Sequence, residues 1–193
     1  MTVTTAVRWW PLVGLAALVA LGLVVGKGST PLDDWFTRTG EVHPFLGKLL
    51  FFTDGRVVFV VWAIVLAATL LRRRWRLAAV IAVAPLVAVV AARLCKRLFG
   101  RLSDGVLAYP SGHTTLAVVV LGLAALAAGV AVWSVVAAAV VAVLGVFGQA
   151  FTYHYFTDTV GAVFLGTSLV CLGAWSAGLD RCQPDCDLSH SSG

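Results

Sequence analysis

Residues 114–150 read TTLAVVVLGLAALAAGVAVWSVVAAAVVAVLGVFGQA and contain no charged side chain. A helix needs about 20 apolar residues to cross a bilayer, so this run is long enough for two crossings. Two crossings return the chain to the side of the membrane that it left. The residues at the two ends of the run are therefore expected on the same membrane face.

Short polar islands stand at or just beyond both ends of this run. The first reads YPSGH, residues 109–113, and the second reads HYFTD, residues 154–158. The shared membrane face would therefore gather two histidines, a serine and an aspartate. These residue types, brought together at the end of an apolar bundle, are typical of an active site.

The composition is that of an integral membrane protein. Of its 193 residues 60% are hydrophobic and 12% are charged, whereas soluble domains are usually about 25% charged. Backbone groups inside hydrocarbon must be satisfied within the segment, so the apolar segments are predicted to be helices. The expected fold is an all-α, integral-membrane six-helix bundle with spans near 10–25, 57–71, 77–94, 114–130, 132–150 and 160–179.

The connection between the first two spans contains PLDDWF, residues 31–36, which has a polar start followed by apolar residues. This pattern predicts a short helix lying on the membrane, and the alternative is a plain connector with aromatic anchors. The basic cluster RRRWR, residues 72–76, predicts a cytoplasmic loop by the positive-inside rule. The polar islands then face the extracytoplasmic side of a multi-pass cell-membrane protein whose two termini are cytoplasmic.

One membrane domain, residues 1–180, is expected, followed by a polar and disordered cytoplasmic tail, residues 181–193. Cys182, Cys186 and His190 in that tail do not form a standard zinc pattern. No metal or cofactor is expected. Nucleic acid is not an expected partner, because the basic residues are not gathered on a soluble surface. The expected partners are the membrane and an anionic lipid.

Phosphate chemistry is indicated by the residues around the first island. Lys96 and Arg101 precede Ser111 and Gly112, which open a helix after a loop rich in glycine and proline. Cationic side chains, a hydroxyl group and free N–H groups at a helix start together favour a phosphate ligand. Taken singly, Ser111 also fits a helix cap and Lys96 fits a side chain that reaches the membrane surface.

The second island places His154 four residues before Asp158, so on a helix both side chains lie on one face. A carboxylate bonded to one imidazole nitrogen leaves the other nitrogen available as base or nucleophile. Such a pair also occurs as a purely structural feature. With His113 on the same membrane face, one histidine can attack phosphorus while the other protonates the leaving oxygen.

The sequence PSGH at 110–113, an upstream lysine and a downstream His-x-x-x-Asp together resemble the type 2 phosphatidic acid phosphatase superfamily of lipid phosphatases. The resemblance implies that His154 is the nucleophile that forms a phosphohistidine, with Asp158 as its orienting partner. It implies that His113 is the general acid and that no metal takes part. The residues implied to hold phosphate are Lys96, Ser111 and Gly112.

Two positions depart from the motifs of that superfamily. Its arginine seven residues after the lysine is replaced by Ser103, and its arginine six residues before the second histidine is replaced by Gly148. Arg101, with help from Gln149, is the expected substitute for binding phosphate.

The expected function is hydrolysis of a phosphomonoester or diphosphate of a polyprenyl or glycerolipid substrate. The alternatives are transfer of the phosphoryl group to an alcohol and a weakened lipid-binding or scaffold protein of the same fold. The sequence does not choose among the lipids, and it does not indicate an oligomeric state.

Overall fold

The computed structural model describes residues 3–103 and 105–179, and almost all of these residues are helical. The expected tail at 181–193, with Cys182 and Cys186, lies outside the described residues. The two short strands β1 (Leu102–Ser103) and β2 (Val106–Leu107) form an antiparallel hairpin. The helices are α1 (Val3–Val25), α2 (Pro31–Val42), the 3-10 helix η1 (Pro44–Thr53), α3 (Gly55–Leu71), α4 (Trp75–Phe99), α5 (Gly112–Ala127), α6 (Val132–Thr152) and α7 (Phe156–Ser176).

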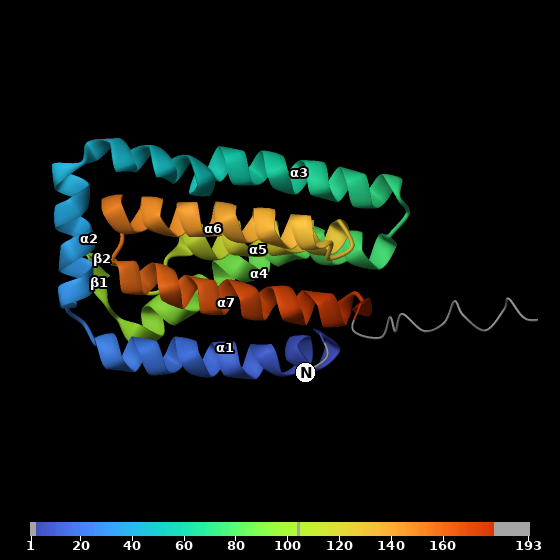
Figure 1. Ribbon diagram of the computed structural model, residues 1–193. Coiled ribbons are helices and arrows are strands. Elements are labelled where there is room, and N and C mark those ends of the chain that lie inside the picture. Colours follow the sequence, from blue (N-terminus) through green and yellow to red (C-terminus); the bar gives the residue numbers. More distant parts are fainter. Residues whose placement is uncertain (1–2, 104, 180–193) are drawn as a thin grey trace, which may run out of the picture.

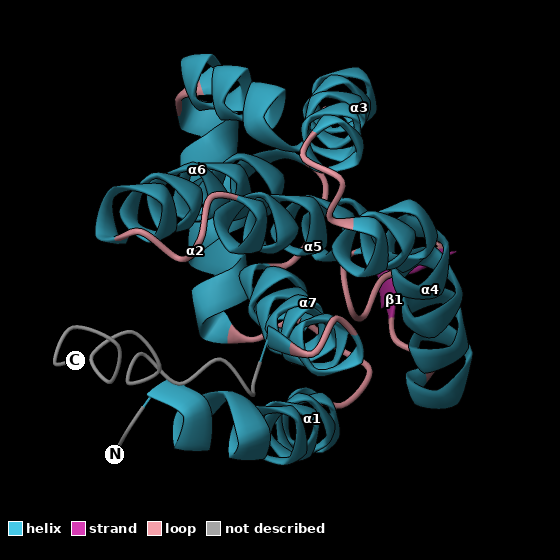
Figure 2. Ribbon diagram, turned by 90° about the vertical axis from the view of Figure 1, so that its right-hand side faces the viewer, coloured by secondary structure: helices cyan, strands magenta, loops and turns pink. Residues whose placement is uncertain are grey.

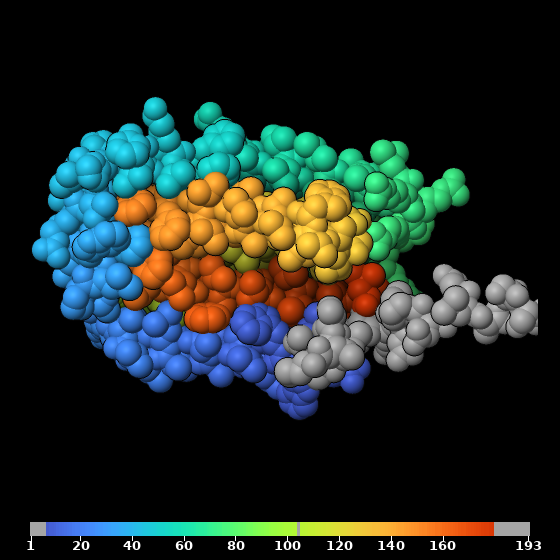
Figure 3. Space-filling view, viewed as in Figure 1, coloured from blue at the N-terminus to red at the C-terminus, as the bar shows by residue number. Residues whose placement is uncertain are grey.

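The predicted all-α bundle is confirmed. Six long helices run along a common direction, and α2 lies across one end of them (Figure 1). On one face, α1, α7, α6 and α3 form adjacent bands, with α2 covering their end (Figure 3). Four of the long helices, together with η1 and α3 taken as one segment, are long and apolar enough to cross a membrane. The chain is therefore a multi-pass membrane protein.

Helix α5 is the exception, with 16 residues or about 24 Å of helix. It lies at the centre of the bundle and contacts α3, α4, α6 and α7 (Figure 2). Because protein surrounds this helix in place of lipid, it does not have to match the full thickness of the hydrocarbon. Its short length leaves room at one end for the polar loop that precedes it.

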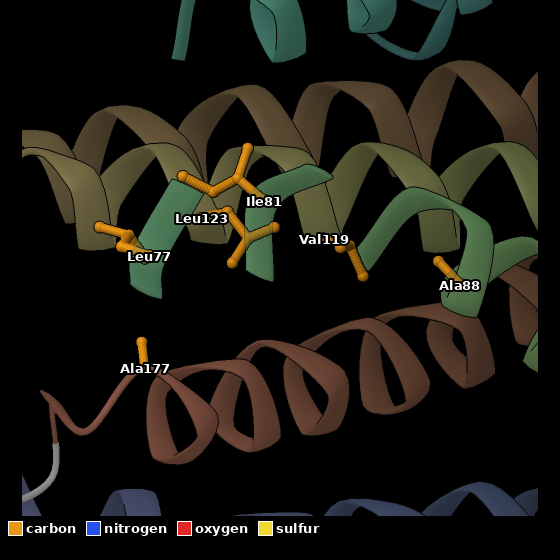
Figure 4. Close-up of a cluster of buried hydrophobic side chains, with 6 residues drawn as sticks. All are labelled: Leu77, Ile81, Ala88, Val119, Leu123 and Ala177. Carbon is orange, nitrogen blue, oxygen red and sulfur yellow. The ribbon is translucent and has the colours of Figure 1, made fainter. Parts of the chain in front are cut away.

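An apolar cluster fixes α4, α5 and α7 against one another at the end away from α2 (Figure 4). Inside a membrane, close packing replaces the hydrophobic effect as the force that associates helices. All six side chains of the cluster are aliphatic, so the cluster serves packing and not chemistry. The cluster comprises Leu77, Ile81, Ala88, Val119, Leu123 and Ala177.

The short helix predicted at residues 31–36 is present as α2. The Thr30 side chain accepts a hydrogen bond from the backbone N–H of Asp33, and the Asp33 carboxylate accepts one from the backbone N–H of Thr30. This reciprocal capping box starts the helix at Pro31. Its inner face buries Asp33 and Phe36, while Trp35 is 53% exposed. That amphipathic character fits the expected place at the membrane surface.

The two ends of the bundle carry different parts of the chain. The N-terminal end of α1, the α3–α4 connection and the C-terminal end of α7 lie together at the end opposite α2 (Figure 1). The arginine cluster at 72–76 belongs to that α3–α4 connection. The loops that carry both polar islands lie at the α2 end. The two islands therefore share one end of the molecule, and the basic cluster occupies the other.

Candidate active site

A cavity of about 840 Å³ opens at the α2 end of the bundle, between α4, α5, η1 and the end of α6. Apolar side chains form part of its wall, among them Val89, Ala92 and Leu116. The wall also contains polar or charged residues and a glycine, which come from three helices and the loop that follows α6. Those that bear on the chemistry are Arg93, Lys96, Gly112, His113, Gln149 and His154.

His113 and Gly112 reach the cavity because α5 begins there. The hydroxyl of Ser111 caps the helix by accepting a hydrogen bond from the Thr114 backbone N–H. The Ser111 backbone N–H donates to the carbonyl of Asp158 at 3.0 Å, which joins the start of α5 to α7. Gly112 and His113 then occupy the first turn, where backbone N–H groups have no partner within the helix.

Ser111 itself is fully buried and does not line the cavity. Its hydroxyl serves the helix start, so the expectation that Ser111 holds phosphate is not supported by its position. The alternative that the sequence left open, a helix cap, describes its contacts. Gly112 lines the cavity, and its role in holding phosphate stays a prediction.

His154 follows α6, and Asp158 lies in the first turn of α7. The distance from His154 Nδ1 to Asp158 Oδ2 is 3.9 Å, with exposed side-chain fractions of 14% and 0%. Both atoms are buried, and neither has a hydrogen-bond partner among the described residues. A separation of 3.9 Å is too long for a hydrogen bond, but catalytic pairs often tighten when a substrate binds. The two unpaired atoms face each other as a nucleophile and its orienting carboxylate would.

Arg101 lies behind this pair and not on the cavity wall. All five of its N–H groups have acceptors: the carbonyl of Gly28, the hydroxyl of Thr157 and the carboxylates of Asp33 and Asp158. Its side chain has no exposed area, and its guanidinium lies 4.6 Å from the ring centre of Tyr155. The expectation that Arg101 binds phosphate is therefore wrong, because no donor is left for a ligand.

Lys96 does line the cavity. Its Nζ donates one hydrogen bond of 2.7 Å to the carbonyl of Leu107 in β2, which leaves two N–H groups for a ligand. Arg93, one turn earlier on α4, lines the same cavity and forms no salt bridge within the described part of the chain. The sequence reasoning missed Arg93. The signal was present, since the spacing of Arg93 and Lys96 places both on one helix face.

Gly148 has a packing reason. A Cβ atom at this position would lie 2.5 Å from the backbone carbonyl carbon of Leu49 in η1. The chain of η1 therefore occupies the space that an arginine at 148 would need. The next residue, Gln149, is 4% exposed and donates from Nε2 to Thr53 Oγ1 at 2.8 Å. Its Oε1 is buried without a partner among the described residues.

A second cavity, of about 400 Å³, reaches His154 from the side of α2. Asp34, Thr37 and Arg38 of α2 form one wall, and Tyr153 and Tyr155 flank the histidine on the other. His154 is thus accessible both from the bundle cavity and from this smaller polar cavity.

A helical membrane bundle that places two histidines at the wall of one cavity has the architecture expected of the type 2 phosphatidic acid phosphatase (PAP2) superfamily. The sequence matches no protein-family model and no curated protein. The fold is similar to the crystal structure of a transmembrane PAP2 type phosphatidylglycerolphosphate phosphatase from Bacillus subtilis. The TM-score is 0.74 at 16% sequence identity, and the match covers 91% of this chain and 100% of the other. This likeness confirms the expected PAP2 fold.

Proposed function

We propose that this chain is an integral-membrane lipid phosphatase that hydrolyses a phosphomonoester or diphosphate of a polyprenyl or glycerolipid. One observation carries the proposal. His113 and His154, which stand 41 positions apart in the sequence, line a single cavity together with Lys96. That cavity has a cationic and polar part for a phosphate group and an apolar part for the adjoining lipid chain.

The reaction follows from the two histidines. The free ring nitrogen of His154 attacks phosphorus, a nitrogen–phosphorus bond forms, and the bond from phosphorus to the lipid oxygen breaks. His113 gives its proton to that oxygen, and the lipid alcohol or lipid phosphate leaves. Water, deprotonated by His113, then attacks phosphorus, and His154 departs as inorganic phosphate is released. Throughout the reaction, the Asp158 carboxylate accepts a hydrogen bond from the Nδ1–H group of His154 and stays ionised.

Charge that develops on the phosphoryl oxygens needs fixed positive partners. Lys96 and Arg93 supply two cations, and the backbone N–H groups of Gly112 and His113 supply the positive end of α5. Arg93 takes the place that the sequence gave to Arg101. The side chains of Val89, Ala92 and Leu116 then border the first part of the lipid tail.

Phosphate release from a panel of lipid phosphates and diphosphates, measured in detergent with EDTA present, tests the function. We expect release by the unaltered protein and by His43→Ala, since His43 is exposed and lies outside both cavities. His154→Ala should release none. Rapid-quench trapping should detect a phosphohistidine in the first two proteins only. A protein inactive on every lipid, or activity that persists in His154→Ala, would overturn the proposal.

We also propose that the active site faces the extracytoplasmic side. Single cysteines replacing Gly105 and Tyr153, in a background without the native cysteines, should react with an impermeant thiol reagent added outside cells. A cysteine replacing Trp75, next to the arginine cluster, should react only after the membrane is opened. Labelling of the first two positions from opposite sides would contradict the shared face.

A further inference from the structure

A closed ion cluster lies behind His154, and of its three members only Asp158 takes part in the proposed reaction steps. The Arg101 guanidinium lies between two carboxylates: Nη2 is 2.8 Å from Asp33 Oδ2, and Nη1 is 2.7 Å from Asp158 Oδ1. None of the three side chains has any exposed area. The cluster joins three segments that are far apart in the sequence, namely α2, the loop before β1 and the start of α7.

Asp33 is held in the cluster by several hydrogen bonds. Its carboxylate accepts hydrogen bonds from the backbone N–H and hydroxyl of Thr157, from the backbone N–H of Thr30 and from Arg101. Burial alone would raise the pKa of Asp33, but these hydrogen bonds outweigh it and hold the pKa below its ordinary value. Asp33 is therefore ionised at neutral pH.

The charges in the cluster do not balance. One guanidinium faces two carboxylates, which leaves one negative charge in a region without solvent contact. The oxygen of Asp158 that Arg101 does not bind is the one that faces His154 Nδ1. Without Asp33, the Arg101–Asp158 pair would be neutral, and the guanidinium would cancel most of the field that Asp158 exerts on the imidazole.

We infer that Asp33 is a positioning residue for the nucleophile: it binds Arg101 and so leaves Asp158 a full negative charge directed at His154. The inference rests on the proposed function, in which His154 carries the phosphoryl group. A negative neighbour favours the positively charged ring that exists when His154 is phosphorylated or protonated. Asp33 lines neither cavity, so it does not touch a substrate there and acts through its neighbours.

Other charged or titratable groups also line the two cavities that reach His154, and none of them is removed when Asp33 is changed. Around the bundle cavity these are Asp54, Arg93, Lys96 and His113. Around the smaller cavity they are Asp34, Arg38, Tyr153 and Tyr155. A change in the protonation of His154 in an Asp33 variant therefore reports on the buried cluster.

The primary test is the pH dependence of kcat/KM for lipid phosphate hydrolysis in Asp33→Asn. His154 must be unprotonated to attack, so weaker stabilisation of its protonated form moves the acid limb of the profile to lower pH. The expected shift is roughly one pH unit for a unit charge at an effective dielectric constant of about 20. We expect kcat to fall while KM stays the same.

Two further variants separate charge from structure. Thr157→Val removes a hydroxyl that contacts both Asp33 and Arg101 but keeps every charge, so it should lower thermal stability without moving the acid limb. The double variant Asp33→Asn with Arg101→Gln leaves Asp158 as the single charge of the cluster. Its acid limb should return toward that of the unaltered protein, although more contacts have been removed.

A readout that does not need turnover keeps this test separate from that of the function. The chain has four histidines, so 15N-histidine NMR in detergent, assigned with His154→Ala, follows the protonation of His154 directly. Asp33→Asn should move its titration midpoint down by the same amount, even if no lipid is hydrolysed. An unmoved midpoint in Asp33→Asn, or a double variant further displaced than the single one, would overturn the inference. If Asp33→Asn does not fold, the other two variants still test the inference. In both the double variant and Thr157→Val, the titration midpoint of His154 must stay close to that of the unaltered protein.

Discussion

The wall of the bundle cavity and the ion cluster behind it use cationic side chains in opposite ways. Lys96 donates one hydrogen bond to a backbone carbonyl, and Arg93 forms no salt bridge within residues 3–103 and 105–179. Arg101, in contrast, has an acceptor for each of its five N–H groups. A cationic side chain can bind a substrate only through N–H groups that have no acceptor in the protein. The distance of Arg101 from a sequence motif therefore does not define its role.

The same difference separates chemistry from stability. The two cations of the cavity wall, Arg93 and Lys96, form few polar contacts with the rest of the protein, and replacing them should affect the reaction more than the fold. Residues of the ion cluster are buried and connect distant segments, so replacing them should affect both. Removing one partner of a buried ion pair is usually strongly destabilising.

After the complete loss expected of His154→Ala, the largest effect is expected in His113→Ala, also at the cavity wall. A general acid contributes about 10²–10⁴-fold to a rate, and its loss matters most when the leaving group is a poor one. Hydrolysis of a lipid monoester, which expels an alkoxide, should fall by that factor, while hydrolysis of an aryl phosphate should fall much less. The values of kcat/KM for the two substrates, compared at one pH, measure this, because kcat/KM does not include the later attack of water, in which His113 is the proposed base. An equal loss on both would assign His113 a role in binding and not in proton transfer.

Arg93→Gln should have the next largest effect, a loss of about 10–10²-fold in kcat/KM with an unchanged unfolding temperature, because one contact to the phosphoryl oxygens is removed. Arg97→Gln is the matched control, since Arg97 is exposed on the same helix and lines neither cavity. Similar small losses in both variants would leave Lys96 as the only cation of the wall that matters.

The features that the sequence predicted are those that depend on local pattern. The six long helices followed from hydropathy and length, and the shared end of His113 and His154 followed from the even number of crossings between them. The start of α2 was readable from Pro31 and its polar neighbours. The capping pair Thr30 and Asp33 belongs to the same local signal.

The features that were not predicted depend on contacts between distant segments. Arg101 and Asp33 are 68 positions apart, and nothing local shows that the two meet. Gly148 was read as a lost arginine, whereas the approach of η1 to α6 explains it. Arg93 is different, because its spacing from Lys96 was visible and an arginine inside an apolar helix already indicates function.

A substitution at Gly148 tests how the packing of η1 against α6 affects stability. Gly148→Ala should lower the free energy of unfolding by about 1–3 kcal/mol, because its Cβ would collide with the backbone of η1. Gly47→Ala on η1 is the control, since the nearest atom to its Cβ would be 3.9 Å away. Thermal unfolding in detergent compares the two variants. If Gly148→Ala were as stable as the control, the packing of η1 would not account for the missing arginine.

The smallest effect concerns the pH dependence of the ion cluster. The folded protein holds the pKa of Asp33 below the ordinary value of 3.8, so this carboxylate stabilises the fold above that pH. The contribution is lost as the pH falls below 3.8 towards the folded pKa. In Asp33→Asn the side chain at this position cannot titrate. The difference in unfolding temperature between this variant and the unaltered protein should therefore be widest near pH 7 and should narrow below pH 4. If the difference in unfolding temperature stayed constant with pH, the charge of Asp33 would not contribute to stability. Its packing and hydrogen bonds would then account for the whole effect.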